Sequence, residues 1–171
     1  LYILTEFSKQ TKFIEHRTIA LDYLQLYTRL SKEAVAPAFT LKNFNNETFT
    51  LSEFKGRYVY LVFWTTWCVP CISEMDFLTK MKQKYGSKVE FVSIACDKQY
   101  LTAYYYMQQK KPEIISLYWG NQYSLLEDYD VRAYPTYVLI GPDGKIVSYP
   151  AISPGVNLDY YLSFLTDIKV K

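Results

Sequence analysis

Two cysteines separated by two residues are the part of this sequence best suited to chemistry. Cys68 and Cys71 lie in the stretch Trp64-Thr-Thr-Trp-Cys-Val-Pro-Cys71. A thiolate is the nucleophile in thiol–disulfide exchange, and this spacing brings both sulfurs within bonding reach across one helical turn. The spacing predicts a redox-active pair, in which Cys68 attacks and Cys71 resolves or leaves.

Zinc binding and simple packing are the alternative readings of this cysteine pair. Tetrahedral zinc needs four protein ligands in a structural site. Beyond the pair, the chain offers only Cys96 and the single histidine, His16, and neither stands at a second paired spacing. We therefore favour a redox pair over a zinc half-site.

The residues around the cysteines predict a strand that runs directly into a helix. The stretch 58–64 is apolar, β-branched and aromatic, and 72–85 carries apolar residues at helical spacing. Pro70 is well tolerated in a first helical turn. Unpaired N–H groups and the dipole at a helix start stabilise a thiolate. We expect Cys68 at the exposed helix start and Cys71 one turn further in.

The rest of the chain alternates strands and helices. This order predicts an α/β fold with a mixed central sheet, helices on both faces and a hairpin at each end of the sheet region. Residues 1–33 read as an N-terminal helical segment: the tail of an upstream domain, a docking helix, or a helix packed on the same core. The main domain is expected over 34–171. The remaining elements are expected at these ranges: helical pattern 9–32; hairpin 39–41 and 48–51; strands 88–95, 114–118 and 136–140, the last returning over 145–149; helices 99–110, 122–129 and 156–168.

Composition excludes several classes of protein. The 171 residues are 50% hydrophobic and 21% charged, which is typical of a globular chain. A net charge of +2 without a dense basic run argues against nucleic acid or an anionic membrane surface as a partner. The longest apolar run is strand-length, so no membrane-spanning helix is expected. The chain begins with Leu1, which we interpret as a processed or truncated product.

Several motifs together resemble the thioredoxin superfamily, and within it the extracytoplasmic TlpA/ResA-type thiol–disulfide oxidoreductases. The resemblance covers roughly residues 34–168. It rests on the Trp-Cys-Val-Pro-Cys stretch, Tyr134-Pro135-Thr136 before a strand, Gly141-Pro-Asp-Gly-Lys145, Ala36-Pro-Ala-Phe-Thr-Leu41 and Leu51-Ser-Glu-Phe-Lys-Gly56. It implies a thioredoxin-like redoxin domain, protein disulfides as substrates, an upstream electron donor, an extracytoplasmic location such as the bacterial periplasm or cell envelope, and no metal or organic cofactor.

The resemblance also assigns roles to individual residues. It implies that Pro135 is cis and lies against the cysteines, whereas the sequence by itself would favour an ordinary trans proline. It implies that Tyr134, through its backbone, binds extended substrate like an added strand, beside Trp67, Val69 and Pro70.

Two departures within the superfamily bear on the chemistry. Cytosolic thioredoxins have a buried Asp where this chain has Val62, while the TlpA/ResA branch has a Glu three residues after the second cysteine, matched by Glu74. Glu74 is a candidate for proton transfer to and from Cys71, or simply a carboxylate favoured by a helix start. Val69 stands where strong oxidants carry a His, so no cation holds the Cys68 thiolate and we expect a reducing pair.

The sequence thus predicts a thiol–disulfide oxidoreductase acting as a reductant. Alternatives are a thiol peroxidase of the peroxiredoxin type and a redox-inactive binding module of the same fold. A Cys–His hydrolase is poorly supported, because the only histidine lies in the N-terminal segment. Cys96, at a strand end, is expected to be buried and structural.

Overall fold

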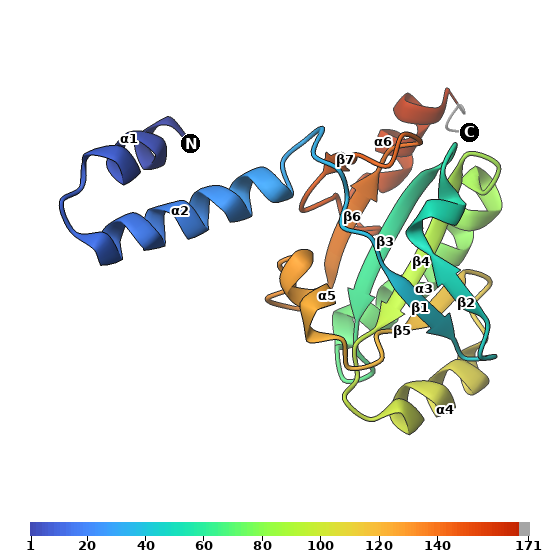
Figure 1. The fold of residues 1–171 in the computed structure, drawn as a ribbon. Helices are drawn as coiled ribbons and strands as arrows, with labels where there is room; N and C mark the ends of the chain where they lie inside the picture. The colour runs from blue at the N-terminus through green and yellow to red at the C-terminus, as the bar shows by residue number, and fades with distance from the viewer. Residues whose placement is uncertain (168–171) are drawn as a thin grey trace.

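A seven-stranded mixed sheet forms the centre of the molecule (Figure 1), in a computed structural model that describes residues 1–167 except the side chain of Leu26. The strand order is β2-β1-β5-β4-β3-β6-β7. The β3–β4 and β4–β5 pairs are parallel, and all other pairs are antiparallel. The strand bounds are β1 Thr40–Asn43, β2 Thr48–Thr50, β3 Tyr58–Trp64, β4 Val89–Ala95, β5 Ile115–Tyr118, β6 Thr136–Ile140 and β7 Ile146–Ser148. The predicted mixed sheet is confirmed.

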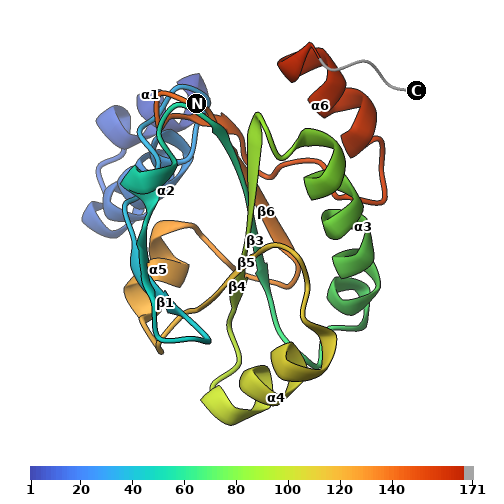
Figure 2. The same ribbon diagram turned by 90° about the vertical axis from the view of Figure 1, so that its right-hand side faces the viewer.

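Helices cover both faces of the sheet, as Figure 2 shows in edge-on view. The side chains of β3 alternate between two apolar clusters, because successive residues of a strand point to opposite faces. One cluster lies under α3, α4 and α6, and the other under α5 and the short 3-10 helix η1. The helix bounds are η1 Leu51–Phe54, α3 Val69–Tyr85, α4 Tyr100–Lys110, α5 Tyr123–Asp128 and α6 Leu158–Thr166.

Most observed elements lie within a few residues of their expected positions. The helix after the cysteines begins at Val69 and not at Ile72, because Cys68 itself caps its first turn. Helix α6 ends at Thr166, and the expected end of this helix at Ile168 lies outside the described residues.

The first 29 residues form a helical hairpin of α1, Tyr2–Gln10, and α2, Ile14–Arg29, which projects away from the sheet region (Figure 1). Both helices lie within the segment 1–33 that we expected to be helical, although the helical pattern was placed at 9–32 and α1 begins earlier, at Tyr2. Ser8 and Ala20 are buried in the hairpin, whereas ten of its large apolar side chains are exposed: Leu1, Tyr2, Ile3, Phe7, Phe13, Ile14, Ile19, Leu21, Tyr23 and Tyr27. Within residues 1–167, no helix has both the length and the apolar character needed to cross a membrane.

The carboxyl ends of β3 and β4 meet at one edge of the sheet. The two strands pair in register from Tyr58 with Val89 to Trp64 with Ala95. In parallel sheets, loops leaving these ends carry the functional residues. The loop after Trp64 and the loop after Ala95 are therefore brought side by side.

Candidate active site

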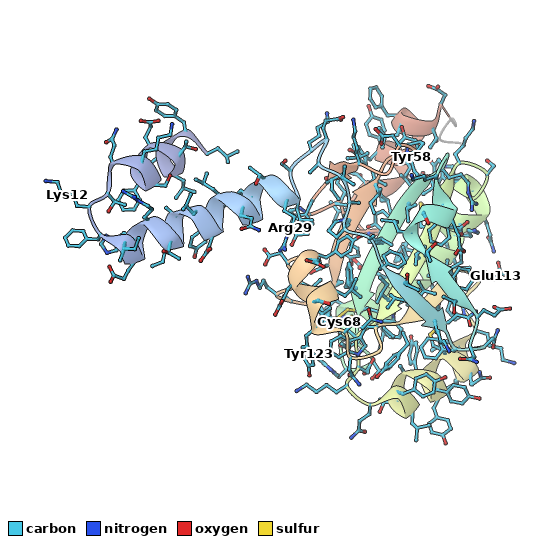
Figure 3. The ribbon with its side chains drawn as sticks, in the orientation of Figure 1. Lys12, Arg29, Tyr58, Cys68, Glu113 and Tyr123 are labelled. Carbon is cyan, nitrogen blue, oxygen red and sulfur yellow. A yellow bond between two sulfur atoms is a disulfide. The ribbon has the colours of Figure 1, made fainter. Side chains whose placement is uncertain are left out.

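Cys68 and Cys71 form a disulfide at the start of α3, with 2.03 Å between their sulfurs. Cys68 is the N-cap of this helix, and Cys71 N–H donates a hydrogen bond of 3.3 Å to Cys68 Sγ. Figure 3 labels Cys68 at the end of the sheet region near α4 and α5. A sulfur that receives a backbone N–H at a helix start is placed to carry negative charge when reduced.

Cys68 is not exposed, contrary to the expectation from the sequence. Its exposed fraction is 4%, against 2% for Cys71, so both sulfurs lie beneath the surface in this disulfide form. The exposed residues at this point are Trp67, at 71%, and Val69, at 76%. Pro70, the second residue of α3, is also exposed. The disulfide thus opens onto a rim of apolar side chains, because these neighbours project into solvent and the cysteines turn inward.

Pro135 is preceded by a cis peptide bond, which confirms the expectation drawn from the resemblance. Phe63 pairs with Thr136 across β3 and β6, so Pro135 lies beside the end of the strand that leads to the cysteines. Tyr134 contacts Trp67 edge-on, with 5.8 Å between ring centroids. The structure therefore brings Tyr134 and Pro135 to the rim. A second cis bond, before Pro150, was not foreseen.

Glu74 lies one turn after Cys71 and accepts a hydrogen bond from the Tyr137 hydroxyl. Burial raises the pKa of Glu74 above its ordinary value, and hydrogen bonds from Ser153 and the Gly155 backbone partly offset this rise. A carboxyl with a raised pKa, on the same helix as Cys71, is suited to accept and return a proton. Val62 lies in the same apolar cluster as Cys71 and supplies no carboxylate.

Tyr137 was missed in the sequence. Its hydroxyl donates to the Glu74 carboxylate, beside the hydrogen bonds from Ser153 and the Gly155 backbone, and its side chain is 6% exposed. Tyr137 lies on β6 in the same apolar cluster as Cys71, and because this relation joins distant parts of the chain it has no local signal in the sequence.

Asp97 was also missed. It follows β4, is 4% exposed, and accepts hydrogen bonds from Thr66, which precedes Trp67 and Cys68. The sequence carried no local signal for it, because the contact depends on the parallel pairing of β3 and β4, which places both following loops at one edge of the sheet.

Cys96 is buried and free, as expected. Burial raises the pKa of the Cys96 thiol to about 12, and its sulfhydryl group donates to the carbonyl of Ile94 at 3.4 Å. A thiol held neutral in this way is a poor nucleophile at neutral pH. Among residues 1–167, no group of three or more His, Cys, Asp or Glu side chains is arranged to hold a metal ion.

Comparison with known proteins places this site in context. A family model described as Redoxin matches residues 31–152. The thiol-disulfide oxidoreductase ResA of Bacillus subtilis is 31% identical over 122 residues, covering 69% of this chain and 66% of ResA. The thioredoxin-like protein YneN of Bacillus subtilis is 31% identical over 139 residues, covering 71% of this chain and 76% of YneN. The chain thus spans about two thirds of the length of ResA.

Solved structures share the fold. The solution structure of a thiol:disulfide interchange protein from Bacteroides sp. superposes with a TM-score of 0.73 at 22% identity, over 81% of this chain and 92% of that protein. At this level of identity the likeness supports the thioredoxin-like architecture and nothing finer.

Proposed function

Because this chain belongs to the redoxin family, we propose that it is a thiol–disulfide oxidoreductase that exchanges electrons with protein disulfides through Cys68 and Cys71. The observation that carries this proposal is the disulfide between the two residues at the start of α3, with the Cys71 N–H directed at Cys68 Sγ. A helix start stabilises the thiolate that exchange requires.

The proposed reaction begins with both cysteines reduced. The Cys68 thiolate attacks one sulfur of a substrate disulfide, and the other substrate sulfur leaves as a thiolate and takes up a proton. Cys71 then gives its proton to Glu74 and attacks Cys68 Sγ. The second substrate sulfur leaves and is protonated. Two electrons and two protons pass to the substrate, and the Cys68–Cys71 disulfide remains.

Glu74 is proposed as the proton acceptor for Cys71. The support is its place one turn after Cys71, its raised pKa and the hydroxyl of Tyr137 that fixes the carboxylate. A buried thiol cannot ionise without an acceptor nearby, since desolvation disfavours its charged form.

The rim formed by Trp67, Val69, Pro70 and Tyr134 is proposed as the substrate contact. Trp67 and Val69 are exposed apolar side chains beside buried sulfurs, and Tyr134 precedes the cis Pro135 at the entrance to β6. A substrate segment in extended conformation would receive backbone hydrogen bonds at Tyr134 and apolar contacts from the rim.

We further propose that the protein acts as a reductant, in an extracytoplasmic compartment, with an upstream electron donor. Val69 supplies no positive charge to the Cys68 thiolate, which favours a reducing couple. The cysteine pair carries the electrons, so no cofactor is needed. The compartment follows from the resemblance to extracytoplasmic oxidoreductases. We propose residues 1–33 as a helical segment distinct from the thioredoxin-like domain at 34–171, since the family match begins at residue 31.

The test is reduction of insulin disulfides with dithiothreitol as the electron source. We expect turnover well above the rate with dithiothreitol alone, and none with Cys68→Ser. Absence of turnover by protein with both thiols free would favour a binding module. Rapid consumption of hydrogen peroxide by Cys71→Ala would favour the peroxidase alternative.

A further inference from the structure

We propose that Asp97 is a positioning residue of this site: it fixes the loop that carries Cys68, and its buried charge disfavours the Cys68 thiolate, which keeps the couple reducing. The inference rests on the proposed exchange reaction and adds to it a determinant of its direction. Asp97 touches neither sulfur in the observed contacts and acts through Thr66.

The carboxylate of Asp97 holds Thr66 at two atoms. The Thr66 N–H lies 3.2 Å from Oδ1 and 3.1 Å from Oδ2, and the Thr66 hydroxyl donates to Oδ1 at 2.6 Å. Cys68 N–H then donates to the Thr65 carbonyl at 3.2 Å, which closes the turn. One carboxylate thus accepts three hydrogen-bond contacts from Thr66. These contacts fix the position of the chain two residues before Cys68.

Asp97 is itself anchored from the other side. Its carbonyl accepts hydrogen bonds from the Tyr118 hydroxyl at 3.0 Å and from Trp119 Nε1 at 2.8 Å. Both donors lie at the end of β5, and Trp119 is 2% exposed. The loop that carries Cys68 is therefore tied to β5 through Asp97, and its position does not depend on α3 alone.

The charge of Asp97 has no cationic partner among the ion pairs of the described residues. The titratable groups close enough to feel it are the side chains of Cys96, Tyr118 and Tyr134, and neighbouring Lys98 is exposed. Burial raises the pKa of Tyr118, and the negative charge of Asp97 adds to that rise. A carboxylate that is 4% exposed acts on its surroundings with little screening.

Cys68 lies within reach of that charge. Two residues of chain span at most roughly 7 Å, so the carboxylate lies within about 10 Å of the Cys68 backbone and within roughly 13 Å of its sulfur. A negative charge at this range disfavours a thiolate. Because a stabilised thiolate makes a dithiol couple more oxidising, disfavouring it makes the couple more reducing. The charge of Asp97 thus disfavours the Cys68 thiolate, whereas the start of α3 stabilises it.

The test uses Asp97→Asn in the full chain, because Asn retains an oxygen that can accept from Thr66 and loses the charge. We expect Cys68 in the reduced variant to react with iodoacetamide about threefold to tenfold faster at pH 6. We expect the equilibrium constant with glutathione to shift by a similar factor toward the dithiol form. An unchanged alkylation profile and an unchanged equilibrium, in a variant with the wild-type thermal transition, would overturn the electrostatic part of the proposal.

Thr66→Val is the second variant and tests positioning with the charge retained. We expect insulin reduction to slow severalfold while the pH profile of Cys68 alkylation stays at its wild-type position, and we expect Thr66→Ser to restore the rate. A wild-type rate in Thr66→Val would overturn the positioning role, whether or not Asp97→Asn folds. The alkylation measurement does not depend on turnover, so failure of the proposed function would be seen separately.

Discussion

The two sulfurs of the disulfide have different surroundings although they are bonded to each other. Around Cys68 the groups are a backbone N–H, the apolar side chains of Trp67 and Val69, and a loop held by Asp97. Around Cys71 they are the apolar cluster beneath α3 and the carboxyl of Glu74. Cys68 is thus surrounded mainly by backbone and exposed apolar side chains, whereas Cys71 has an ionisable side chain one turn further along its helix.

The largest effect should come from replacing either cysteine with serine, because each replacement removes one chemical step of the proposed exchange. The two variants should differ, because each removes a different step. Cys71→Ser retains the attack and loses the resolution, so we expect it to accumulate mixed disulfides with protein substrates. Cys68→Ser loses the attack, and we expect almost no covalent complexes. Non-reducing electrophoresis after incubation with an oxidised protein mixture measures both.

The same experiment tests the assignment of roles to Cys68 and Cys71. Equal trapping by the two variants, or faster alkylation of Cys71 than of Cys68 in the reduced wild type, would show that the assignment of nucleophile and resolver is wrong. Cys96 serves as an internal reference, because burial raises its thiol pKa to about 12 and keeps it unreactive near neutral pH.

The second prediction concerns Glu74→Gln, which removes the proton acceptor on the Cys71 side. General acid–base catalysis contributes about a hundredfold or more in typical enzymes, so we expect resolution of the mixed disulfide to slow by about that factor at neutral pH. In the wild type, the carboxylate is lost as pH falls through its raised pKa. The wild-type resolution rate should therefore fall toward the rate of the variant in acid, as stopped-flow kinetics would detect.

Tyr137→Phe is the matched control for that variant. It keeps the ring and removes the hydroxyl that donates to Glu74. Because this hydrogen bond favours the carboxylate form, its loss should raise the pKa of Glu74 further and move the acid limb of the profile to higher pH. If Glu74→Gln leaves both the rate and the profile unchanged, Glu74 has no part in proton transfer.

A smaller effect is expected for Trp67→Ala on the Cys68 side. Loss of an exposed aromatic contact should lower kcat/KM for a protein substrate by roughly fivefold to tenfold. Stability should change by no more than about 0.5 kcal/mol, since Trp67 is 71% exposed. Tyr160→Ala on α6, where the side chain is 72% exposed, is the control and should leave kcat/KM unchanged. An equal loss in both variants would argue against the rim as the substrate contact.

Cys96→Ala should have the smallest effect on exchange. The thiol is buried and its pKa is raised, and its hydrogen-bond contacts are with the Ile94 carbonyl, the Tyr134 side chain and the Trp64 backbone. We expect wild-type insulin reduction and a loss of about 1 kcal/mol in the free energy of unfolding, from the small cavity that remains. A large loss of turnover with the fold intact would give Cys96 a redox role that its surroundings do not support.

The sequence predicted those features that depend on local pattern. The strand Tyr58–Trp64 was predicted with its observed bounds, because six of its seven residues are β-branched or aromatic and the seventh is Leu61. The cis bond before Pro135 followed from the resemblance and not from the residues themselves.

Features that depend on long-range geometry were not predicted. The Glu74–Tyr137 and Thr66–Asp97 contacts join residues 63 and 31 positions apart. Each needs the strand order and the facing of side chains, which one sequence does not determine. The predicted exposure of Cys68 was wrong for the same reason. Its position at the helix start was predicted correctly, but whether a helix start faces solvent depends on the loops packed around it.

The N-terminal hairpin differs from the sheet region in how its backbone will exchange hydrogen with water. Helix α2 is tied to the domain through Arg29, which contacts Asp128 and the carbonyl of Glu127. Local opening free energy follows the number of buried contacts, and those are few in a hairpin whose large apolar side chains are exposed. Amides of α1 and α2 should therefore exchange through local opening, whereas those of β3 and β4 should exchange only when the whole domain unfolds.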